Sequence, residues 1–235
     1  VLFRSRGPSI GPLGRVTEQD WLAVGAGDGI YTSVDPADSR WLYTTREYGT
    51  HVRFDQSLGY PTPIRPIAQP AGAAPYRFLW EPPIIVSPSD SRVIYAGAQK
   101  LLRSTDRGDH WTEISPDLST NPADKILPES EGGVPGGIPW FAISYLAEST
   151  LAKGTIWAGT ADGQVQLTRD DGKNWTNLTA RIDALGGRPN AYVSRVRASS
   201  HVAGRAYVSR SGYKFDRSEE HTSELQSRLH LVCRL

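Results

Sequence analysis

Two short stretches combine carboxylates, a glycine and a tryptophan at a spacing that could support chemistry. They are STDRGDHW at 104–111 and TRDDGKNW at 168–175. Closely spaced acids occur in calcium loops, in catalytic acid pairs and in tight turns. A calcium loop of the EF-hand type needs oxygen ligands at alternate positions through to a distal glutamate, and this pattern lacks them. A catalytic pair is disfavoured because the same element recurs at separate places in the chain, so the pattern favours a structural turn.

The residue types in the first stretch suit the closing of a hairpin. The side-chain oxygens of Ser104 and Asp106 can accept hydrogen bonds from backbone N–H groups that a tight turn leaves unpaired. Gly108 can adopt positive φ without steric cost, and Trp111 can cover the hairpin with a large apolar face. The second stretch keeps the same roles in Thr168, Asp170, Gly172 and Trp175. We therefore expect no metal at either stretch.

Both ends of the chain read as translated nucleotide adapters. RSEEHTSELQS, which opens the segment 217–235, back-translates in frame to the constant part of a widely used short-read sequencing adapter. VLFRS at 1–5 matches the reverse complement of the matching adapter arm. The alternative for the tail is a genuine C-terminal amphipathic helix. The sequence predicts an adapter-derived segment at 1–5, a protein fragment at 6–216, and an adapter-derived segment at 217–235 that is disordered or arbitrarily helical.

Excluding these ends changes what the composition implies. The remaining segment has equal numbers of basic and acidic residues, which argues against a nucleic-acid partner. The sole cysteine, Cys233, lies in the tail, so we expect no disulfide and no thiol nucleophile. The remaining histidines, His51, His110 and His201, are too scattered for a metal cluster. We expect no cofactor, and no membrane insertion because no apolar run approaches about 20 residues.

A repeat of turns and strands organises the segment. Four stretches, at 34–49, 86–100, 147–163 and 198–212, each combine a strand end, a Ser/Asp/Gly turn and a strand with a central aromatic residue. Successive aromatic residues are 52, 62 and 50 residues apart, and they are Tyr43, Tyr95, Trp157 and Tyr207. This spacing is slightly longer than the roughly 40 to 50 residues of common propeller blades, which leaves room for loops.

Short β-branched and aromatic runs predict four strands in each complete period. The expected strands are 29–34, 41–45, 51–55 and 63–67, then 83–88, 93–99, 101–104 and 111–115, then 143–149, 155–160, 164–168 and 175–179. Residues 21–25 would be the last strand of a preceding blade. No stretch has a convincing helical apolar period, so we expect helix to be rare.

Four-stranded sheets at this period predict an all-β fold, a partial β-propeller with an incomplete ring. A solenoid or an immunoglobulin-like array fits the strand content but not the four-strand period with matched turns. The segment holds about three blades and the start of another, which ends near Asp216. Such an arc leaves blade faces exposed and lacks the rest of its own propeller.

The motif S/T-x-D-x-G-x-x-W resembles the Asp-box, or BNR repeat, of sialidases, of xyloglucan-degrading glycosidases and of the sortilin propeller. The longer sequence from about Trp21 to Asp216 is similar to secreted bacterial proteins with sortilin-like and BNR-like propellers, which are often labelled glycosyl hydrolases. The resemblance is carried by stretches such as VSPSDSRVIYAGAQKLLRSTDRGDHWTEISPDLSTN and GTIWAGTADGQVQLTRDDGKNWTNLT. It implies a longer secreted or periplasmic parent with the motifs at the blade periphery and a ligand at the central channel.

Candidate ligand residues lie on loops that lead into inner strands, because rigid scaffolds present binding groups on loops. YRFLWEPP leads into the second blade and offers Arg77, Trp80 and Glu81. PESEGGVPGGIPWF leads into the third blade and offers Glu129, Glu131 and Trp140. Tryptophan beside carboxylates suits sugar stacking and also peptide capture. The alternative is that the tryptophans fill wedges between blades and the glutamates are a solvated rim.

Two functional hypotheses follow, with the catalytic residues left unassigned. The favoured one is a binding scaffold that captures a peptide or a glycan at the propeller channel. The alternative is part of a glycoside hydrolase, which needs two carboxyl groups about 5 to 9.5 Å apart. Glu81 with Glu129 or Glu131 at that separation would favour the enzyme.

Overall fold

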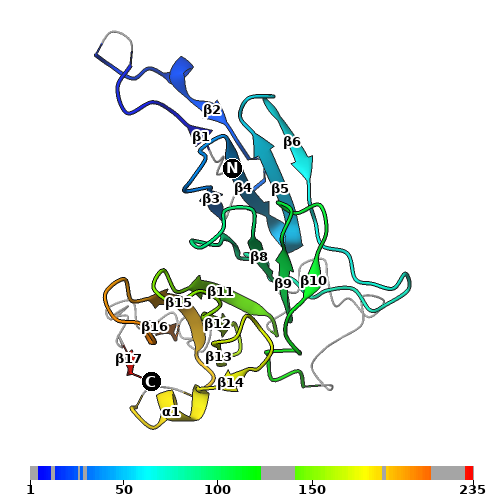
Figure 1. Cartoon of the computed structure of the whole chain (residues 1–235), viewed down its shortest axis with the longest axis vertical. Coiled ribbons are helices and arrows are strands. Elements are labelled where there is room, and N and C mark those ends of the chain that lie inside the picture. The colour runs from blue at the N-terminus through cyan, green and yellow to red at the C-terminus, as the bar shows by residue number, and fades with distance from the viewer. Residues whose placement is uncertain are drawn as a thin grey trace, which may run out of the picture.

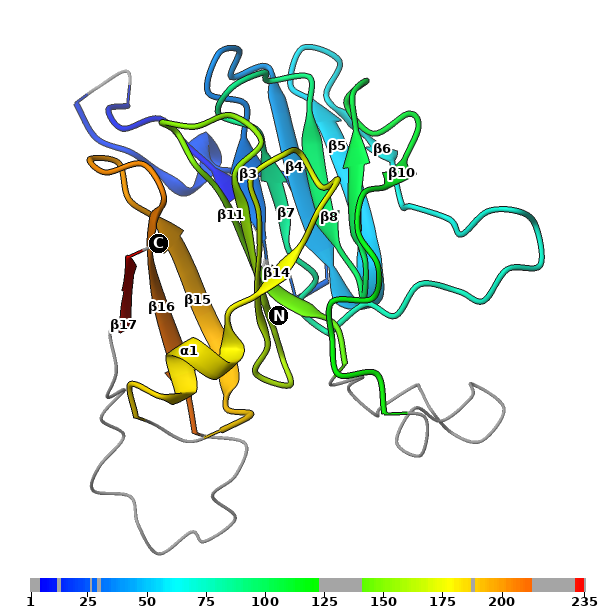
Figure 2. The same ribbon diagram turned by 60° about the horizontal axis from the view of Figure 1, so that its bottom comes forward.

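Successive antiparallel sheets make up the chain. The computed structural model describes residues 5–11, 14–25, 27–28, 31–122, 141–186, 189–212 and 231–234. Three four-stranded sheets and one three-stranded sheet follow one another along the sequence, and strands adjacent in sequence are adjacent in each sheet (Figure 1). Figure 1 shows these sheets in chain order, from blue and cyan through green to yellow and orange, and Figure 2 shows the orange fourth sheet and the cyan strands of the first sheet on opposite sides of the view. We call the three four-stranded sheets and the three-stranded sheet, in chain order, the first to fourth blades.

The blades have the following strands. The first comprises β3 (Thr32–Val34), β4 (Trp41–Arg46), β5 (Thr50–Asp55) and β6 (Tyr60–Pro63). The second comprises β7 (Ile84–Val86), β8 (Ile94–Gly97), β9 (Leu101–Ser104) and β10 (Thr112–Glu113). The third comprises β11 (Ile143–Glu148), β12 (Ile156–Thr160), β13 (Val165–Thr168) and β14 (Thr176–Asn177). The fourth comprises β15 (Tyr192–Ala198), β16 (Arg205–Ser211) and β17 (Leu231–Arg234).

The repeated aromatic residue lies in the second strand of every blade and shows where the arc ends. Tyr43, Tyr95 and Trp157 are at most 2% exposed, because each packs in an apolar cluster shared with the next blade. Tyr207 occupies the same position in the fourth blade and is 39% exposed, and no further described blade follows it. The predicted all-β arc with an exposed blade face is therefore confirmed.

A polar residue ends the first strand of each blade and closes the turn to the second strand. The Asp35 carboxylate accepts hydrogen bonds from the backbone N–H groups of Ala37 and Asp38. A serine hydroxyl accepts the corresponding backbone hydrogen bonds in the other three blades, from Ser87, Ser149 and Ser199. These side-chain oxygens accept hydrogen bonds from backbone N–H groups that have no partner in the strand ladder. This need explains why Ser or Asp recurs at these turns.

The fourth strand of the first blade was predicted at 63–67, and this placement is wrong. The strand is β6, Tyr60–Pro63, and it pairs with β5. Gly59, at φ 78°, donates its N–H to the carbonyl of Asp55, so the chain reverses earlier than expected. The two prolines of β6, Pro61 and Pro63, are tolerated because β6 is an edge strand and needs few N–H donors.

The described residues at the two ends depart from the blade pattern. β2 (Leu22–Ala23) pairs with β1 (Ser5–Arg6) in a two-stranded sheet, and Val24 packs against Leu42 and Phe54 of the first blade. In the tail, β17 is extended and pairs with β16. An open strand edge such as that of β16 pairs readily with any extended chain, which accounts for this strand.

Helix is rare in the described residues, as expected. It comprises α1 (Thr179–Asp183) and two single turns, η1 (Glu18–Asp20) and η2 (Glu47–Gly49). No helix among the described ranges has the length and apolar character to span a bilayer.

Candidate functional site

The antiparallel order of the strands divides the turns between two rims. Each first strand contacts the first strand of the next blade: β3 contacts β7, β7 contacts β11, and β11 contacts β15. These four strands therefore form the inner wall of the arc, as Figure 2 shows. One rim carries the connections into these strands and the turns from second to third strands. The opposite rim carries the turns from first to second and from third to fourth strands, including 104–111 and 168–175. We call these last two the motif hairpins.

Hydrogen bonds within the motif hairpins close the turn between the third and fourth strands. The Ser104 hydroxyl accepts a bond of 2.7 Å from the N–H of Gly108, and the Asp106 carboxylate accepts one of 2.9 Å from the N–H of His110. The second hairpin repeats these bonds with Thr168, Gly172, Asp170 and Asn174. The acids therefore satisfy the turn's own donors.

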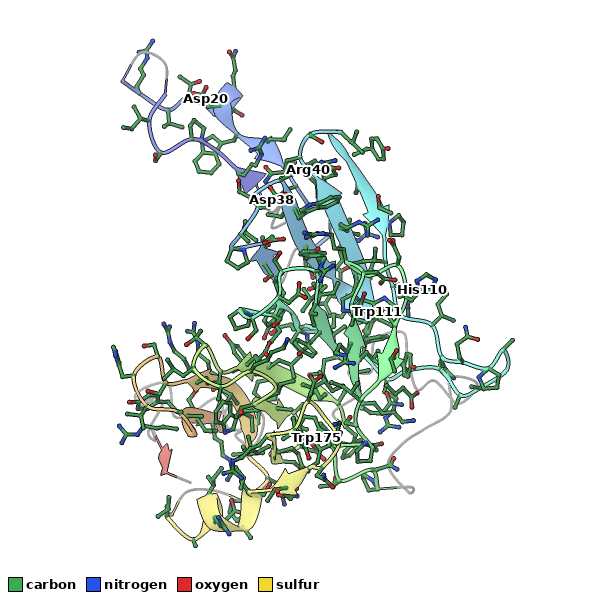
Figure 3. The ribbon with its side chains drawn as sticks, viewed as in Figure 1. Asp20, Asp38, Arg40, His110, Trp111 and Trp175 are labelled. Carbon is green, nitrogen blue, oxygen red and sulfur yellow. The ribbon has the colours of Figure 1, made fainter. Side chains whose placement is uncertain are left out.

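Each motif hairpin also holds the preceding blade. The indole N–H of Trp111 donates to the carbonyl of Ile64 at 2.9 Å, and that of Trp175 donates to the carbonyl of Ile114 at 2.9 Å. Ile64 and Ile114 directly follow the fourth strands of the first and second blades. Figure 3 shows the two tryptophans on successive blades. These side chains thus join blades rather than face a ligand.

The acids of the motif hairpins are poorly suited to proton transfer. Hydrogen bonds from the side chain and backbone of Asn174 and from Thr168 lower the pKa of Asp170 to about 2. Both carboxylate oxygens of Asp170 already accept hydrogen bonds. Within the described ranges, no three His, Cys, Asp or Glu side chains gather closely enough to hold a metal ion.

One equivalent position recurs in or directly before the first strand of every blade. It lies four residues before the turn-closing Asp or Ser, and its occupants are Tyr31, Pro83, Tyr145 and Arg195. The register places each of them opposite a residue of the second strand, respectively Thr45, Gly97, Gly159 and Ser209. We call these four residues the axial layer.

Contacts within the axial layer cross from the first blade to the third. The hydroxyl of Tyr31 donates to the carbonyl of Ser144 at 3.0 Å. The rings of Tyr31 and Tyr145 meet edge to face with centroids 6.0 Å apart. The guanidinium carbon of Arg195 lies 5.9 Å from the centre of the Tyr145 ring, within the range of a cation–π contact. The layer therefore combines two aromatic faces with a cation.

The charge state of Tyr31 follows from its surroundings. Burial raises the pKa of Tyr31 far above its ordinary value, and the nearby groups Tyr145, Tyr192 and Glu81 raise it further. The phenol therefore remains protonated and keeps donating to Ser144. Glu81 is an exposed acid near this layer.

The predicted residues of the loop before β7 have different roles. Trp80 is half-buried and meets Tyr48 edge to face, with ring centroids 5.0 Å apart. Tyr48 lies in η2 with φ 53°, a strained value for a residue other than glycine. Trp80 thus lies against the neighbouring turn of the first blade, as a wedge residue would.

Arg77 is already bound by neighbouring loops. Its guanidinium lies 2.5 Å from the Asp117 carboxylate, 3.4 Å from the Ser119 hydroxyl and 3.3 Å from the carbonyl of Phe141. Its backbone N–H donates to the side chain of Gln99. This arginine therefore ties loops of the second blade to the start of the third. The other three predicted residues, Glu129, Glu131 and Trp140, lie outside the described residues.

Sequence reasoning missed Tyr31, Tyr48, Tyr145 and Arg195. For three of them a signal was present, because Tyr31, Tyr145 and Arg195 stand at one constant distance from the turn-closing residue. Tyr48 has no comparable repeat, and its contact with Trp80 follows only from the turn conformation of η2.

Blades with their first strands innermost and their hairpins docked on the preceding blade define an open β-propeller arc. No family model and no curated protein matches the chain. Its fold is similar to that of an ancestral GH74 enzyme, at TM-score 0.51 and 14% identity over 78% of this chain and 22% of that one. Further likenesses are to the GH74 xyloglucanase of Xanthomonas campestris and to YCF48 bound to D1 peptide.

The last two likenesses are weaker in structure. The xyloglucanase has TM-score 0.49 and 18% identity over 77% of this chain and 26% of its own. YCF48 has TM-score 0.45 and 17% identity over 78% of this chain and 46% of its own. The chain therefore spans about a quarter of the length of the two GH74 proteins and under half of YCF48.

Proposed function

We propose that this chain is part of a β-propeller binding scaffold that captures a glycan or a peptide at the axial layer. The observation that carries the proposal is the convergence of Tyr31 and Tyr145, from blades separated by another blade, with Arg195 beside them. Aromatic faces supply contact area for sugars and for peptide side chains at low entropic cost. The rigid inner strands hold these groups in place.

Neighbouring side chains on the same rim extend this surface. The half-buried Trp80 offers a further aromatic side chain, and the exposed residue Glu81 can accept hydrogen bonds from a ligand. The motif hairpins lie on the opposite rim and are occupied with structural bonds. Ligand capture is therefore proposed for the axial rim alone.

Secretion belongs to the proposal and rests on the resemblance to secreted sortilin-like and BNR-like proteins. Resemblance also underlies the proposal that the parent is longer and supplies further blades. The adapter origin of the two end segments remains a prediction, since it depends on the nucleotide reading alone.

The experiment is a binding panel for the whole chain, using oligosaccharides of xyloglucan, cellulose, alginate and polygalacturonate together with extended peptides. We expect at least one member to bind by calorimetry, and no reducing sugar to be released. Failure of every member to bind would reject the scaffold. Release of sugar that stops in the Glu81→Gln variant would instead favour the glycoside hydrolase.

A further inference from the structure

We propose that the ligand of the axial layer is an acidic glycan, a polysaccharide containing uronic acid, whose carboxylate binds Arg195. This inference rests on the proposed function, which leaves open whether a glycan or a peptide binds. It assigns the ligand class from the chemistry of Arg195 and its neighbours.

Arg195 has no carboxylate partner among the described residues. Seven arginines each pair with an aspartate, namely Arg40, Arg53, Arg77, Arg92, Arg103, Arg107 and Arg210. Arg195 is exposed and rests against the Tyr145 ring. A guanidinium is always charged and binds a carboxylate through two parallel hydrogen bonds, so its unpaired N–H groups are available to an anionic ligand.

The strand fixes the direction of this arginine. The register of β15 and β16 shifts between Val193 and Arg195, which is a bulge next to the axial layer. Bulges re-aim side chains and often lie beside functional sites. The contact with Tyr145 limits the rotamers of Arg195, so less entropy is lost when its planar fork meets a carboxylate.

A second arginine beside an aromatic residue follows on the same face of β15. Arg197 is exposed, whereas the intervening Val196 is buried, so Arg195 and Arg197 share one face. Arg197 lies directly opposite Tyr207, which is 39% exposed. Residues two apart on a strand are separated by about 7 Å. In the first three blades the position of Tyr207 packs against the next blade, so of the two arginines only Arg195 belongs to the axial layer.

A uronic acid matches the chemistry of the layer better than an acidic peptide does. Its ring carbons can lie on a tyrosine face, its carboxylate can pair with Arg195, and its hydroxyls can donate to Glu81. An acidic peptide side chain would supply a carboxylate but no hydroxyl donor for Glu81. The observed pair of opposite charges beside aromatic rings therefore favours the sugar.

The test compares oligogalacturonate with its methyl ester, which keeps the sugar and removes the charge. For the whole chain, we expect oligogalacturonate to bind at least 10-fold more tightly than the ester, and Arg195→Gln to abolish that preference. Arg181→Gln, an exposed arginine on α1, is the matched control and should keep it. Both variants should unfold at the temperature of the unchanged chain.

Other outcomes separate this inference from the proposed function. Binding of a neutral glycan that exceeds binding of oligogalacturonate would overturn the inference and leave the scaffold standing. An oligoglutamate peptide that binds more tightly, with loss in Arg195→Gln, would also overturn it, because the ligand would then be a peptide. If no glycan and no peptide binds, the proposed function itself fails.

Discussion

Replacing Trp157 by alanine is expected to lower the free energy of unfolding by about 3 to 5 kcal/mol. The indole is 1% exposed and belongs to the cluster between the third and fourth blades, where it is accompanied by Val193 and Val196. Truncation removes a large apolar surface and leaves a cavity that the strands can fill only in part. Urea unfolding followed by circular dichroism measures the change.

Tyr207→Ala is the matched control, because Tyr207 occupies the equivalent position in the fourth blade and is 39% exposed. We expect this change to cost less than about 1 kcal/mol, since surface substitutions rarely have large effects. Equal losses for the two variants would mean that the face of the fourth blade is covered as well, contrary to the open arc described above.

Gly172→Ala is expected to destabilise the chain by roughly 2 to 4 kcal/mol. The glycine has φ +89°, and a Cβ atom there would overlap the backbone carbonyl oxygen of Ile114 in the preceding blade. Positive φ costs an alanine about 1 kcal/mol or more, and overpacking against a neighbour adds about 1 to 3 kcal/mol. Urea unfolding of the purified variant measures the sum.

The variant Gly186→Ala separates the cost of positive φ from the cost of overlap with the preceding blade. Gly186 has φ +97°, yet a Cβ atom there would meet nothing within 4 Å. We expect this variant to show only the cost of positive φ, about 1 kcal/mol. If Gly172→Ala were no worse than Gly186→Ala, the motif hairpin would not be holding the preceding blade.

The period of the strands was predictable because it depends on local chemistry. Turn-closing Ser and Asp side chains, glycine turns and alternating β-branched residues act within a few positions of each other, so they can be read from the sequence. The fourth strand of the first blade was misplaced because Gly59 starts the reversal, while the prolines after it read equally well as part of a later strand.

The candidate site was less predictable because it depends on contacts distant in sequence. Arg77 was proposed for a ligand, but its Asp117 partner lies in a loop whose position follows only from the packed blades. Tyr31 and Tyr145 meet across an intervening blade, so the register of two separate sheets was needed to bring them together. Trp80 and Glu81 lie near the axial layer and remain predictions as ligand residues, whereas their aromatic neighbours Tyr31, Tyr48 and Tyr145 were missed.

The most direct test of the account compares Tyr145→Leu with Asp170→Ala, using the glycan or peptide of the panel that binds most tightly. Leucine keeps apolar packing at the half-buried position of Tyr145 and removes the aromatic face. We expect Tyr145→Leu to raise Kd at least 10-fold with little change in unfolding, because the proposed site places the ligand on this ring. Asp170→Ala should lower stability and leave Kd unchanged. An unchanged Kd in Tyr145→Leu, or a large rise in Asp170→Ala, would contradict the placement of function at the axial layer.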